Sequence, residues 1–439
     1  MPATAHVVVI GAGIAGVSAG YQLTERGVGQ VVIVDPRPPL TLTSDKSTEC
    51  YRNFWPSPDM VALTNHSIDL FEDLAEDSDD YFGLRPRGYL FVTADPQRLD
   101  VMERQAETAS AYGTGPVRRH RGAEAYGAAP NGVDILTGHT LHEAFPYLTD
   151  AALGALHVRR AGWFSAQQLG ALMLERFKSA GGELVRGEVA DIAVDNEIVR
   201  GVRLVEGADI EAGAVVVAAG PMTAQVAATT GLDLPLFSEL HLKVSFNDHL
   251  GVVPRDAPML IWSDPQHIEW SEGERSELAA LGRDELVGEM PLFCHGRPEG
   301  GADSPYFVGL WEYHREVMDP VWPLPEDPLY PEVVLRGLTA MVPGLGVYHD
   351  RLPPFTVDGG YYTKTEENRP LIGPAGPRGL HLVTGLSGFG VMVAAAAGDL
   401  VAAHVCDEPL PAYADAFLLS RYDDSDYLES VATGDTGQL

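Results

Sequence analysis

The most constraining feature of the sequence is a glycine motif near its start, Gly11-Ala12-Gly13-Ile14-Ala15-Gly16. The motif follows a short β-branched run, 7–10, and precedes an amphipathic stretch, so it predicts a strand, a tight turn and a helix. A second apolar run, 31–34, ends in Asp35, twenty-four residues after Gly11. This order completes a βαβ unit of the kind that binds dinucleotides.

Each part of the motif has a geometric role. Gly11 permits the tight turn, Gly13 lets a pyrophosphate approach the backbone, and Gly16 lets helix and strand pack closely. The helix start, at Ile14 and Ala15, presents free N–H groups and a positive dipole end to the phosphates. Asp35, followed by Pro36 and Arg37, is placed to accept hydrogen bonds from the ribose hydroxyls. A turn that needs glycine only for packing is the alternative, and the strand–turn–helix–strand–acid order disfavours it.

A second strand–turn–helix unit lies far along the chain. An apolar strand, 380–383, leads through a glycine turn into a helix of small residues, 391–403. The turn and the helix start are suited to face the electron-rich end of a flavin. Taken alone, the segment is explained equally well as a packing turn. The turn consists of Gly385, Leu386, Ser387, Gly388, Phe389 and Gly390.

The charge of the chain limits its partners. Sixty-two acidic and thirty basic residues give a formal charge of −32, which would repel nucleic acid and anionic membranes. We therefore expect small-molecule partners. The nearest approach to a membrane-spanning stretch, 391–405, is interrupted by Gly398, Asp399 and His404, so a membrane protein is not expected.

The cysteines and the N-terminus indicate the compartment. Cys50, Cys294 and Cys406 are widely spaced and odd in number, which argues against a disulfide framework and fits a reducing cytoplasm. The first residues lack the basic start of an export signal. No His, Cys, Asp and Glu grouping has metal-binding spacing, and no GxSxG nucleophile motif is present, so metal and acyl-transfer chemistry are not expected.

Several further segments, in their order and spacing, carry a resemblance to a known family. They are the strand 87–92, Gly162-Trp163-Phe164-Ser165 with the helix 168–179, and the run 202–205 followed by 214–220. Together with the two glycine turns they resemble the D-amino-acid oxidase superfamily, in its sarcosine oxidase, glycine oxidase and dimethylglycine dehydrogenase branch. The resemblance covers about nine-tenths of the chain.

The resemblance implies FAD as the cofactor and an α/β fold with two lobes. A Rossmann-like FAD-binding domain would be assembled from residues 1–85, 150–232 and 355–425. A substrate-binding domain on a mixed β-sheet would comprise 86–149 and 233–354, and 426–439 would form an acidic tail. In the FAD domain the resemblance adds Val189, Ala219 and Gly220 to the expected cofactor contacts.

The loop after Asp35 is similar to the family's loop between pyrophosphate and flavin ring. Hydroxyls at Ser44, Ser47 and Thr48 suit phosphate or ribityl oxygens, whereas a helix cap of the Ser/Thr-x-x-Glu type is the alternative. Arg52 lies where similar oxidases hold the substrate carboxylate, and its planar fork of donors suits that role; a structural ion pair is the alternative. Nearby aromatic residues either line the pocket or belong to the core, namely Tyr51, Phe54 and Trp55.

The remaining pocket candidates come from the second half of the chain. His295 lies in a segment similar to a family strand that lines the pocket, where an imidazole would accept or position the amine proton; a structural histidine is the alternative. Three more residues are expected to line the substrate pocket, namely Arg297, Tyr362 and Met392.

Four positions depart from the family pattern. Met392 stands where sarcosine oxidases carry a lysine for the substrate carboxylate, and Leu310 where they carry one that promotes reaction with oxygen. Gly360 aligns near the cysteine that binds flavin covalently in monomeric sarcosine oxidase. Cys50 falls near the flavin-linked histidine of dimethylglycine dehydrogenases, and a surplus buried cysteine is its alternative.

The expected reaction is oxidation of a C–N bond in a small primary or secondary amine or amino acid, by hydride transfer to the flavin and formation of an imine. Oxygen or another acceptor would then take the electrons. Three alternatives stay open: a flavin enzyme of this fold that tailors a natural-product intermediate, a dehydrogenase subunit that passes electrons to a partner protein, and a dinucleotide-binding module without turnover.

Overall fold

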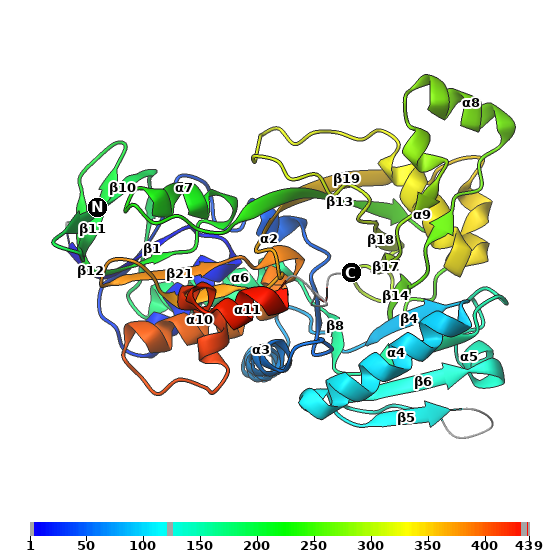
Figure 1. The fold of residues 1–439 in the computed structure, drawn as a ribbon, viewed down its shortest axis with the longest axis horizontal. Coiled ribbons are helices and arrows are strands. Elements are labelled where there is room, and N and C mark those ends of the chain that lie inside the picture. The colour runs from blue at the N-terminus through cyan, green and yellow to red at the C-terminus, as the bar shows by residue number, and fades with distance from the viewer. Residues whose placement is uncertain (1–3, 121–125, 432–436, 438–439) are drawn as a thin grey trace.

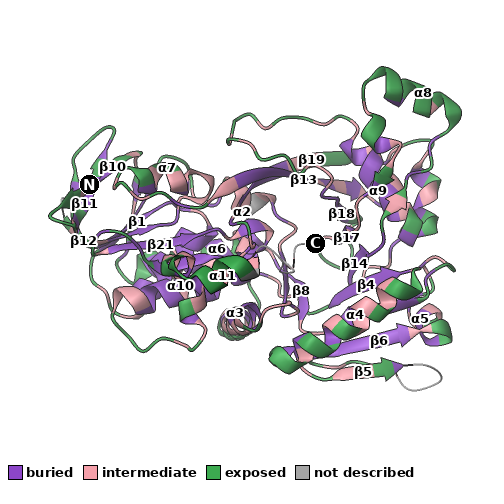
Figure 2. Ribbon diagram, viewed as in Figure 1, coloured by how far each residue is buried: buried purple, intermediate pink, exposed green. Residues whose placement is uncertain are grey.

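The computed structural model describes residues 4–120, 126–431 and 437. Figure 1 shows two lobes side by side, one around the N-terminal strands and one around strands from the middle of the chain. Each lobe has its own sheet and its own hydrophobic core. In Figure 2 the central strands of both sheets are coloured as buried.

The first lobe is built on an eight-stranded sheet within the described residues. Its centre is parallel, in the order β21, β12, β1, β2, β9, as expected for βαβ units. Antiparallel strands extend it: β11 pairs with β12, β10 with β11, and β20 with β21. The strands are β1 (Thr4–Ile10), β2 (Val31–Asp35), β9 (Glu183–Arg186), β10 (Val189–Asp195), β11 (Ile198–Leu204), β12 (Ile210–Val217), β20 (Leu371–Pro374) and β21 (Leu380–Thr384).

Helices α1 (Ile14–Glu25) and α10 (Gly390–Val405) pack against each other in this lobe, with α3 (Pro58–Asp77) against α10 and α6 (Ala166–Ser179) against α1. The crossing of α1 and α10 is close, because a Cβ at Gly398 would stand 2.2 Å from the hydroxyl oxygen of Ser18. By length and composition alone, 387–405 would suffice to cross a membrane, but 72% of that window is buried inside the protein. Its burial in the core accounts for its apolar sequence.

The second lobe is built on a nine-stranded sheet in the order β19, β13, β18, β17, β14, β4, β7, β6, β5. Its longest strands, β13 and β19, pair over ten positions and run along the upper part of Figure 1 from the first lobe into the second. The strands are β4 (Tyr89–Thr93), β5 (Val117–His120), β6 (Val133–Thr137), β7 (Gly154–Val158), β13 (Phe237–Asn247), β14 (Met259–Trp262), β17 (Cys294–Pro298), β18 (Tyr306–Leu310) and β19 (Phe355–Lys364).

Helices and two short strand pairs complete the described structure. β3 (Cys50–Arg52) pairs with β8 (Ala161–Trp163), and β15 (Gln266–His267) pairs with β16 (Glu289–Met290). The remaining helices are α2 (Thr43–Lys46), α4 (Pro96–Ala109), α5 (Gly138–Ala144), α7 (Thr223–Ala228), α8 (Glu272–Ala280), α9 (Tyr330–Met341) and α11 (Ser425–Val431). The two short pairs are separate from both large sheets.

The strand pairing changes the predicted domain boundaries. β7 and β19 fall in segments assigned to the FAD domain, 150–232 and 355–425, but both hydrogen-bond within the nine-stranded sheet. The predicted acidic tail, 426–439, begins inside α11, and the Tyr427 hydroxyl donates to the Glu367 carboxylate. Of the rest of that tail, 432–436 and 438–439 lie outside the described residues. The boundary errors arise because alternation of apolar residues shows a strand but not its sheet.

Candidate active site

A cavity of about 780 Å³ lies in the first lobe beside the carboxyl ends of its parallel strands. This is the edge at which open α/β sheets bind ligands. Runs of consecutive residues line it: 10–15, 34–38, 40–44, 187–191, 218–222, 361–363 and 383–388. Its volume lies in the upper part of the range found for small-molecule sites.

The glycine turn borders this cavity with the geometry expected from the motif. Gly11 has φ +108°, and a Cβ there would stand 2.3 Å from the carbonyl oxygen of Ala218. A Cβ at Gly16 would stand 1.9 Å from the carbonyl oxygen of Gly11. Gly13 has extended backbone, φ −71°, and its Cβ would meet only the Ser44 hydroxyl, at 3.3 Å. Gly11 and Gly16 are therefore required by the fold, whereas Gly13 keeps the helix start accessible.

Two side chains complete the polar wall of the cavity. The Asp35 carboxylate accepts hydrogen bonds from the backbone N–H groups of Ala12 and Arg37, both at 2.8 Å. The Ser44 hydroxyl accepts one from the N–H of Ile14 at 2.9 Å, so it lies at the N-terminus of α1. That helix end favours an anionic group because of the N–H groups of its first turn and the positive end of its dipole.

The structure brings most of the predicted cofactor residues to this cavity. Those that line it are Gly11, Gly13, Ile14, Ala15, Asp35, Pro36, Arg37, Ser44, Ser47, Val189, Ala219, Gly220, Gly385, Leu386, Ser387, Gly388 and Gly390. Gly16 is not part of the described lining, and it packs against the carbonyl oxygen of Gly11. Thr48 and Phe389 instead line a second, smaller cavity. Both glycine turns thus border one cavity, although they are more than 370 residues apart in the sequence.

The family of the chain follows from a match over nearly its whole length. The sequence model of the family described as FAD dependent oxidoreductase (DAO) matches residues 6–404. The chain belongs to this family. FAD is therefore its cofactor, and the cavity fits it: the glycine turn and the N-terminus of α1 suit the pyrophosphate, Asp35 suits the ribose, and the second turn borders the same space.

The chain is similar in sequence to a curated enzyme and in fold to several solved structures. The chain is 26% identical over 255 residues to the mitochondrial sarcosine dehydrogenase of Mus musculus, and the match covers 56% of this chain and 26% of that protein. The chain thus spans about a quarter of the length of that relative. L-proline dehydrogenase from P. horikoshii superposes with a TM-score of 0.75 at 20% identity, covering 96% and 99% of the two chains. Glycine oxidase from Geobacillus kaustophilus gives 0.74 at 21% identity, covering 95% and 98%.

The smaller cavity, of about 50 Å³, adjoins the large one and shares Tyr362 and Gly388 with it. A Cβ at Gly388 would stand 2.5 Å from the Tyr362 ring, so the ring packs directly on the second glycine turn. Polar and apolar side chains from many elements line this cavity: Thr48, Cys50, Arg52, Trp55, Tyr89, Met259, His295, Glu312, Phe389, Met392 and, by its backbone, Gly437.

Arg52 extends into the small cavity from β3. Its guanidinium lies over the Trp55 ring, 4.5 Å from the ring centre, and its Nε donates to the carbonyl oxygen of Phe54 at 3.1 Å. Its Nη2 donates to the carbonyl oxygen of Gly437 at 2.6 Å. Arg52 is buried, and a backbone carbonyl from the far end of the chain accepts one of its hydrogen bonds in the cavity.

His295, on β17, also lines the small cavity. Burial lowers the pKa of its imidazole to about 4, so the ring is neutral near pH 7. Its Nδ1 lies 2.7 Å from the carbonyl oxygen of Phe293. Because a carbonyl only accepts, Nδ1 carries the proton and Nε2 is left as an acceptor. This arrangement suits a histidine that accepts a hydrogen bond from a substrate N–H group. It does not suit one that removes a proton from a cationic substrate.

Two predicted pocket residues lie elsewhere, and Tyr51 is the first. Within the described structure it lines neither cavity: it is buried in the core of the first lobe and stacks on Phe164 with ring centres 5.9 Å apart. Successive side chains of a strand point to opposite faces, so Tyr51 points away from the cavity that Cys50 and Arg52 line.

Arg297 is the second. In the part of the chain that is described it contributes to neither cavity lining but binds the loop beneath them. Its Nε and Nη2 donate to the carbonyl oxygen of Thr48 at 2.9 and 2.7 Å, and Nη2 forms an ion pair with Glu299 at 2.7 Å. Arg297 thus has the structural ion pair that is the alternative role for Arg52.

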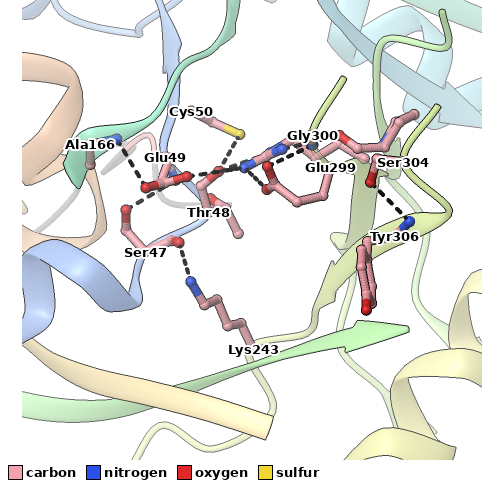
Figure 3. Close-up of polar contacts among 12 residues, drawn as sticks. Ser47, Thr48, Glu49, Cys50, Ala166, Lys243, Glu299, Gly300, Ser304 and Tyr306 are labelled. Carbon is pink, nitrogen blue, oxygen red and sulfur yellow. Dashed lines mark hydrogen bonds and ion pairs between the residues drawn. The ribbon is translucent and has the colours of Figure 1, made fainter. Parts of the chain in front are cut away.

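The loop 47–50 is fixed by contacts from three directions, as Figure 3 shows. Lys243 donates to the carbonyl oxygen of Ser47 at 2.9 Å, and the Glu49 carboxylate accepts from the N–H of Ala166 at 2.9 Å. The Cys50 thiol donates to the carbonyl oxygen of Thr48 at 3.1 Å. Burial raises the pKa of this thiol, so it is mostly protonated at neutral pH.

The hydroxyls of Ser44, Ser47 and Thr48 do not cap the short helix α2, which was the alternative role for this loop. The N-cap of α2 is Leu42, and no side chain caps that helix. At Gly360 the backbone approaches Thr43 closely, since a Cβ there would stand 3.1 Å from the Thr43 Cα. Among the described residues no group of three or more His, Cys, Asp or Glu side chains is arranged to hold a metal ion.

Sequence reasoning missed Glu312, the acidic side chain in the lining of the small cavity, and His241, which contacts it. Glu312 follows β18, two residues after Leu310, the position at which sarcosine oxidases carry a lysine. A signal was present in β13, where Glu239 and His241 alternate with leucines and so share one face of a buried strand.

Proposed function

We propose that this enzyme oxidises a C–N single bond in a small amine or amino acid to an imine. The observation that carries the proposal is the small cavity that adjoins the cofactor cavity and holds a buried arginine and a buried carboxylate, Arg52 and Glu312. Membership of the FAD dependent oxidoreductase family supports it, as do relatives named for sarcosine, proline and glycine.

When bound in the large cavity, FAD would supply the acceptor for a hydride from the carbon next to the substrate nitrogen. Arg52 binds the substrate carboxylate through its planar fork, in place of the Gly437 carbonyl. His295 accepts a hydrogen bond from the substrate N–H on its Nε2 and so directs the nitrogen lone pair. Trp55, Phe389 and Met392 contribute apolar surface that excludes water from the reacting carbon.

We further propose that the electrons leave to an acceptor other than oxygen. A fixed positive charge near the flavin ring favours reaction with oxygen, because it stabilises superoxide. Leu310 carries no charge, and three cations on nearby strands of the same sheet, β13, β19 and β17, are engaged with other groups. Lys243 donates to Ser47, Lys364 pairs with Glu239 at 2.9 Å, and Arg297 pairs with Glu299 at 2.7 Å.

The test is an anaerobic spectral screen. The purified protein is expected to carry bound FAD, and a panel of primary and secondary amines and amino acids is mixed with it without oxygen. Bleaching of the visible flavin band by some of these compounds supports the proposal, and the compounds that bleach it define the substrate. A protein that holds FAD but is bleached by none of them, while dithionite bleaches it, would point to a specialised natural-product substrate. A protein without FAD would point to a non-catalytic module.

A further inference from the structure

A row of four ionisable side chains leads from the small cavity toward the surface, across the face of β13 and β19. Glu312 Oε1 lies 3.4 Å from His241 Nδ1, and His241 Nε2 lies 3.1 Å from Glu239 Oε2. The Lys364 ammonium lies 2.9 Å from the same Glu239 oxygen. Glu312 and His241 are almost fully buried, whereas 12% of the Lys364 side chain is exposed.

The register of two strands assembles the row. Glu239 and His241 are two residues apart on β13, so their side chains share one face of the sheet. Tyr362 and Lys364 are two residues apart on β19 and lie on the same face. Glu239 lies opposite Tyr362 in the ladder. The His241 ring stacks on the Tyr362 ring, with centres 3.9 Å apart and planes 13° apart. The His241 imidazole thus lies between the Glu239 and Glu312 carboxylates. It also stacks on the Tyr362 ring, which borders both cavities.

Carboxylates and nitrogen-bearing groups alternate along the row, and the His241 ring has a carboxylate oxygen beside each of its nitrogens. Burial would raise the pKa of Glu239, but hydrogen bonds from His241 and Lys364 hold it below its ordinary value. From Lys364 to Glu312 the row therefore runs ammonium, carboxylate, imidazole, carboxylate, and its last carboxylate lies in the cavity.

Other ionisable groups also border Glu312. Arg52, Cys50 and His295 line the same cavity from β3 and β17, and Tyr89 lines it from β4. Burial raises the pKa of the Tyr89 and Cys50 groups, so both are neutral near pH 7, as is His295. The cavity therefore presents one cation, Arg52, and one anion, Glu312, among otherwise neutral groups. This pair matches the two charges of an amino-acid zwitterion.

We propose that Glu312 binds the ammonium group of the substrate and accepts its proton, so that the amine is neutral when the hydride leaves. The proton moves from the substrate nitrogen to a Glu312 oxygen, and no other bond changes in this step. His241, Glu239 and Lys364 are positioning residues that hold the Glu312 carboxylate in place before the substrate binds.

The proposal rests on the proposed function but is tested first by binding alone. The probes are glycine betaine and 3,3-dimethylbutanoate, which share one shape and one carboxylate and differ only in the permanent positive charge of betaine. Their affinities for the FAD-bound enzyme are read from the shift of the visible flavin band. We expect the wild-type enzyme to prefer betaine by on the order of tenfold or more, because Glu312 attracts the cation.

Glu312→Gln should reduce this preference to about one, because the amide keeps the size of the side chain and removes its charge. Glu312→Asp should retain part of it. Glu316→Gln, an exposed glutamate in the same loop, is the matched control and should leave the preference unchanged. Equal affinities in the wild-type enzyme, or binding of neither probe, would overturn the inference even if Glu312→Gln failed to fold.

The proton step is tested by the pH dependence of flavin bleaching with an amine found in the screen. Without a proton acceptor only the neutral fraction of the amine reacts, so the rate for Glu312→Gln should rise by about tenfold per pH unit below the pKa of the amine. The wild-type rate should be much flatter between pH 7 and 9, and His241→Asn should be intermediate. Parallel profiles for wild type and Glu312→Gln would refute the proton role. If the enzyme prefers betaine but no amine bleaches its flavin, the proposed function is refuted, whereas the binding role of Glu312 is retained.

Discussion

The two adjoining cavities are built in different ways. Consecutive residues line the large cavity, and seven of them are glycines, so it is shaped mainly by backbone. Single side chains from many separate elements line the small cavity, and most of them are large or charged. A backbone-lined site binds a constant ligand whatever the surrounding side chains are, whereas a site of separate side chains can change its ligand one residue at a time.

The sharpest way to break this contrast is to add a side chain to the backbone-lined cavity. Gly13→Val should abolish FAD binding, because the new methyl groups would lie at the start of α1 beside Ser44. The fold should survive, since the backbone at Gly13 is extended and its Cβ would meet only that hydroxyl. The measurement is the ratio of visible to protein absorbance of the purified protein, with circular dichroism for folding.

Gly273→Val is the matched control, because a Cβ at this position of α8 has open space around it. Stoichiometric FAD in a folded Gly13→Val protein would contradict the cofactor assignment of the large cavity.

The second prediction addresses the side-chain-lined cavity. Arg52→Ala should weaken the binding of 3,3-dimethylbutanoate by about 2–5 kcal/mol, because a desolvated charge-assisted pair is lost. FAD content should stay the same, since Arg52 lines only the small cavity. Spectral titration of the FAD-bound variant measures this loss, and Arg87→Ala, which removes an exposed arginine, serves as the control. Unchanged affinity would assign Arg52 to the structural ion-pair alternative.

The third prediction concerns how the reduced cofactor is reoxidised. With Leu310 in place of a lysine, substrate-reduced enzyme should react with oxygen at least about tenfold more slowly than with a quinone-like dye. Stopped-flow mixing with each acceptor gives the two rates. Reoxidation by oxygen that keeps pace with reduction by the substrate would show that another cation acts near the ring and that the enzyme is an ordinary oxidase.

The fourth prediction compares folding in acid and neutral solution. Burial and, second to it, the positive charge of Arg159 lower the pKa of His157, on β7, to about 3. An unfolded histidine binds a proton near pH 6.5, so the unfolded chain binds more protons than the folded one between pH 6.5 and 3. Folding stability therefore falls as the pH falls through this range, by up to about 1.4 kcal/mol per pH unit for this residue.

His157→Gln should flatten that pH dependence, and urea unfolding at pH 7, 6 and 5 measures it. The exposed His139→Gln is the control and should keep the wild-type slope. A His157→Gln protein with the wild-type slope would show that other groups, such as His295 and His381, whose pKa values burial also lowers to about 4, govern the acid response.

The smallest expected effect comes from the far end of the chain. Deletion of residues 432–439 removes Gly437, whose carbonyl accepts a hydrogen bond from Arg52. A carboxylate ligand would then no longer compete with it, and the affinity for 3,3-dimethylbutanoate should rise by a few-fold, corresponding to about 1 kcal/mol for one hydrogen bond. Deletion of 438–439 alone retains Gly437 and should give the wild-type affinity. Weaker binding after the longer deletion would mean that this segment helps to form the pocket.

The contrast between the cavities also explains what the sequence revealed. Gly11, Gly13 and Asp35 lie within one βαβ unit, so their spacing alone predicts their joint geometry. The fold class and FAD were predicted, and the family match and the solved structures confirm them. The second glycine turn was ambiguous by itself, and it borders the cofactor cavity because β21 pairs with β12.

The substrate side was harder to predict because its contacts depend on register. Glu312 and His241 come together only through the alignment of β13, β18 and β19, which no local pattern specifies. Tyr51 was misplaced by the same uncertainty, since one residue along a strand reverses the face. Arg297 was expected in the pocket from its position on β17, but its length lets it reach back to the Thr48 carbonyl.

The long pair β13–β19 has a consequence for how the protein can be taken apart. The chain enters the second lobe with β4, after α3, returns at β8, enters it again with β13 and returns after β19. Each excursion begins and ends at the first lobe, so no single cut in the backbone separates a cofactor-binding piece from a substrate-binding piece. Chimaeras between relatives must therefore exchange both excursions together, including the strands that border the cofactor cavity. Changing specificity by point substitution in the small cavity is the simpler route for protein engineering.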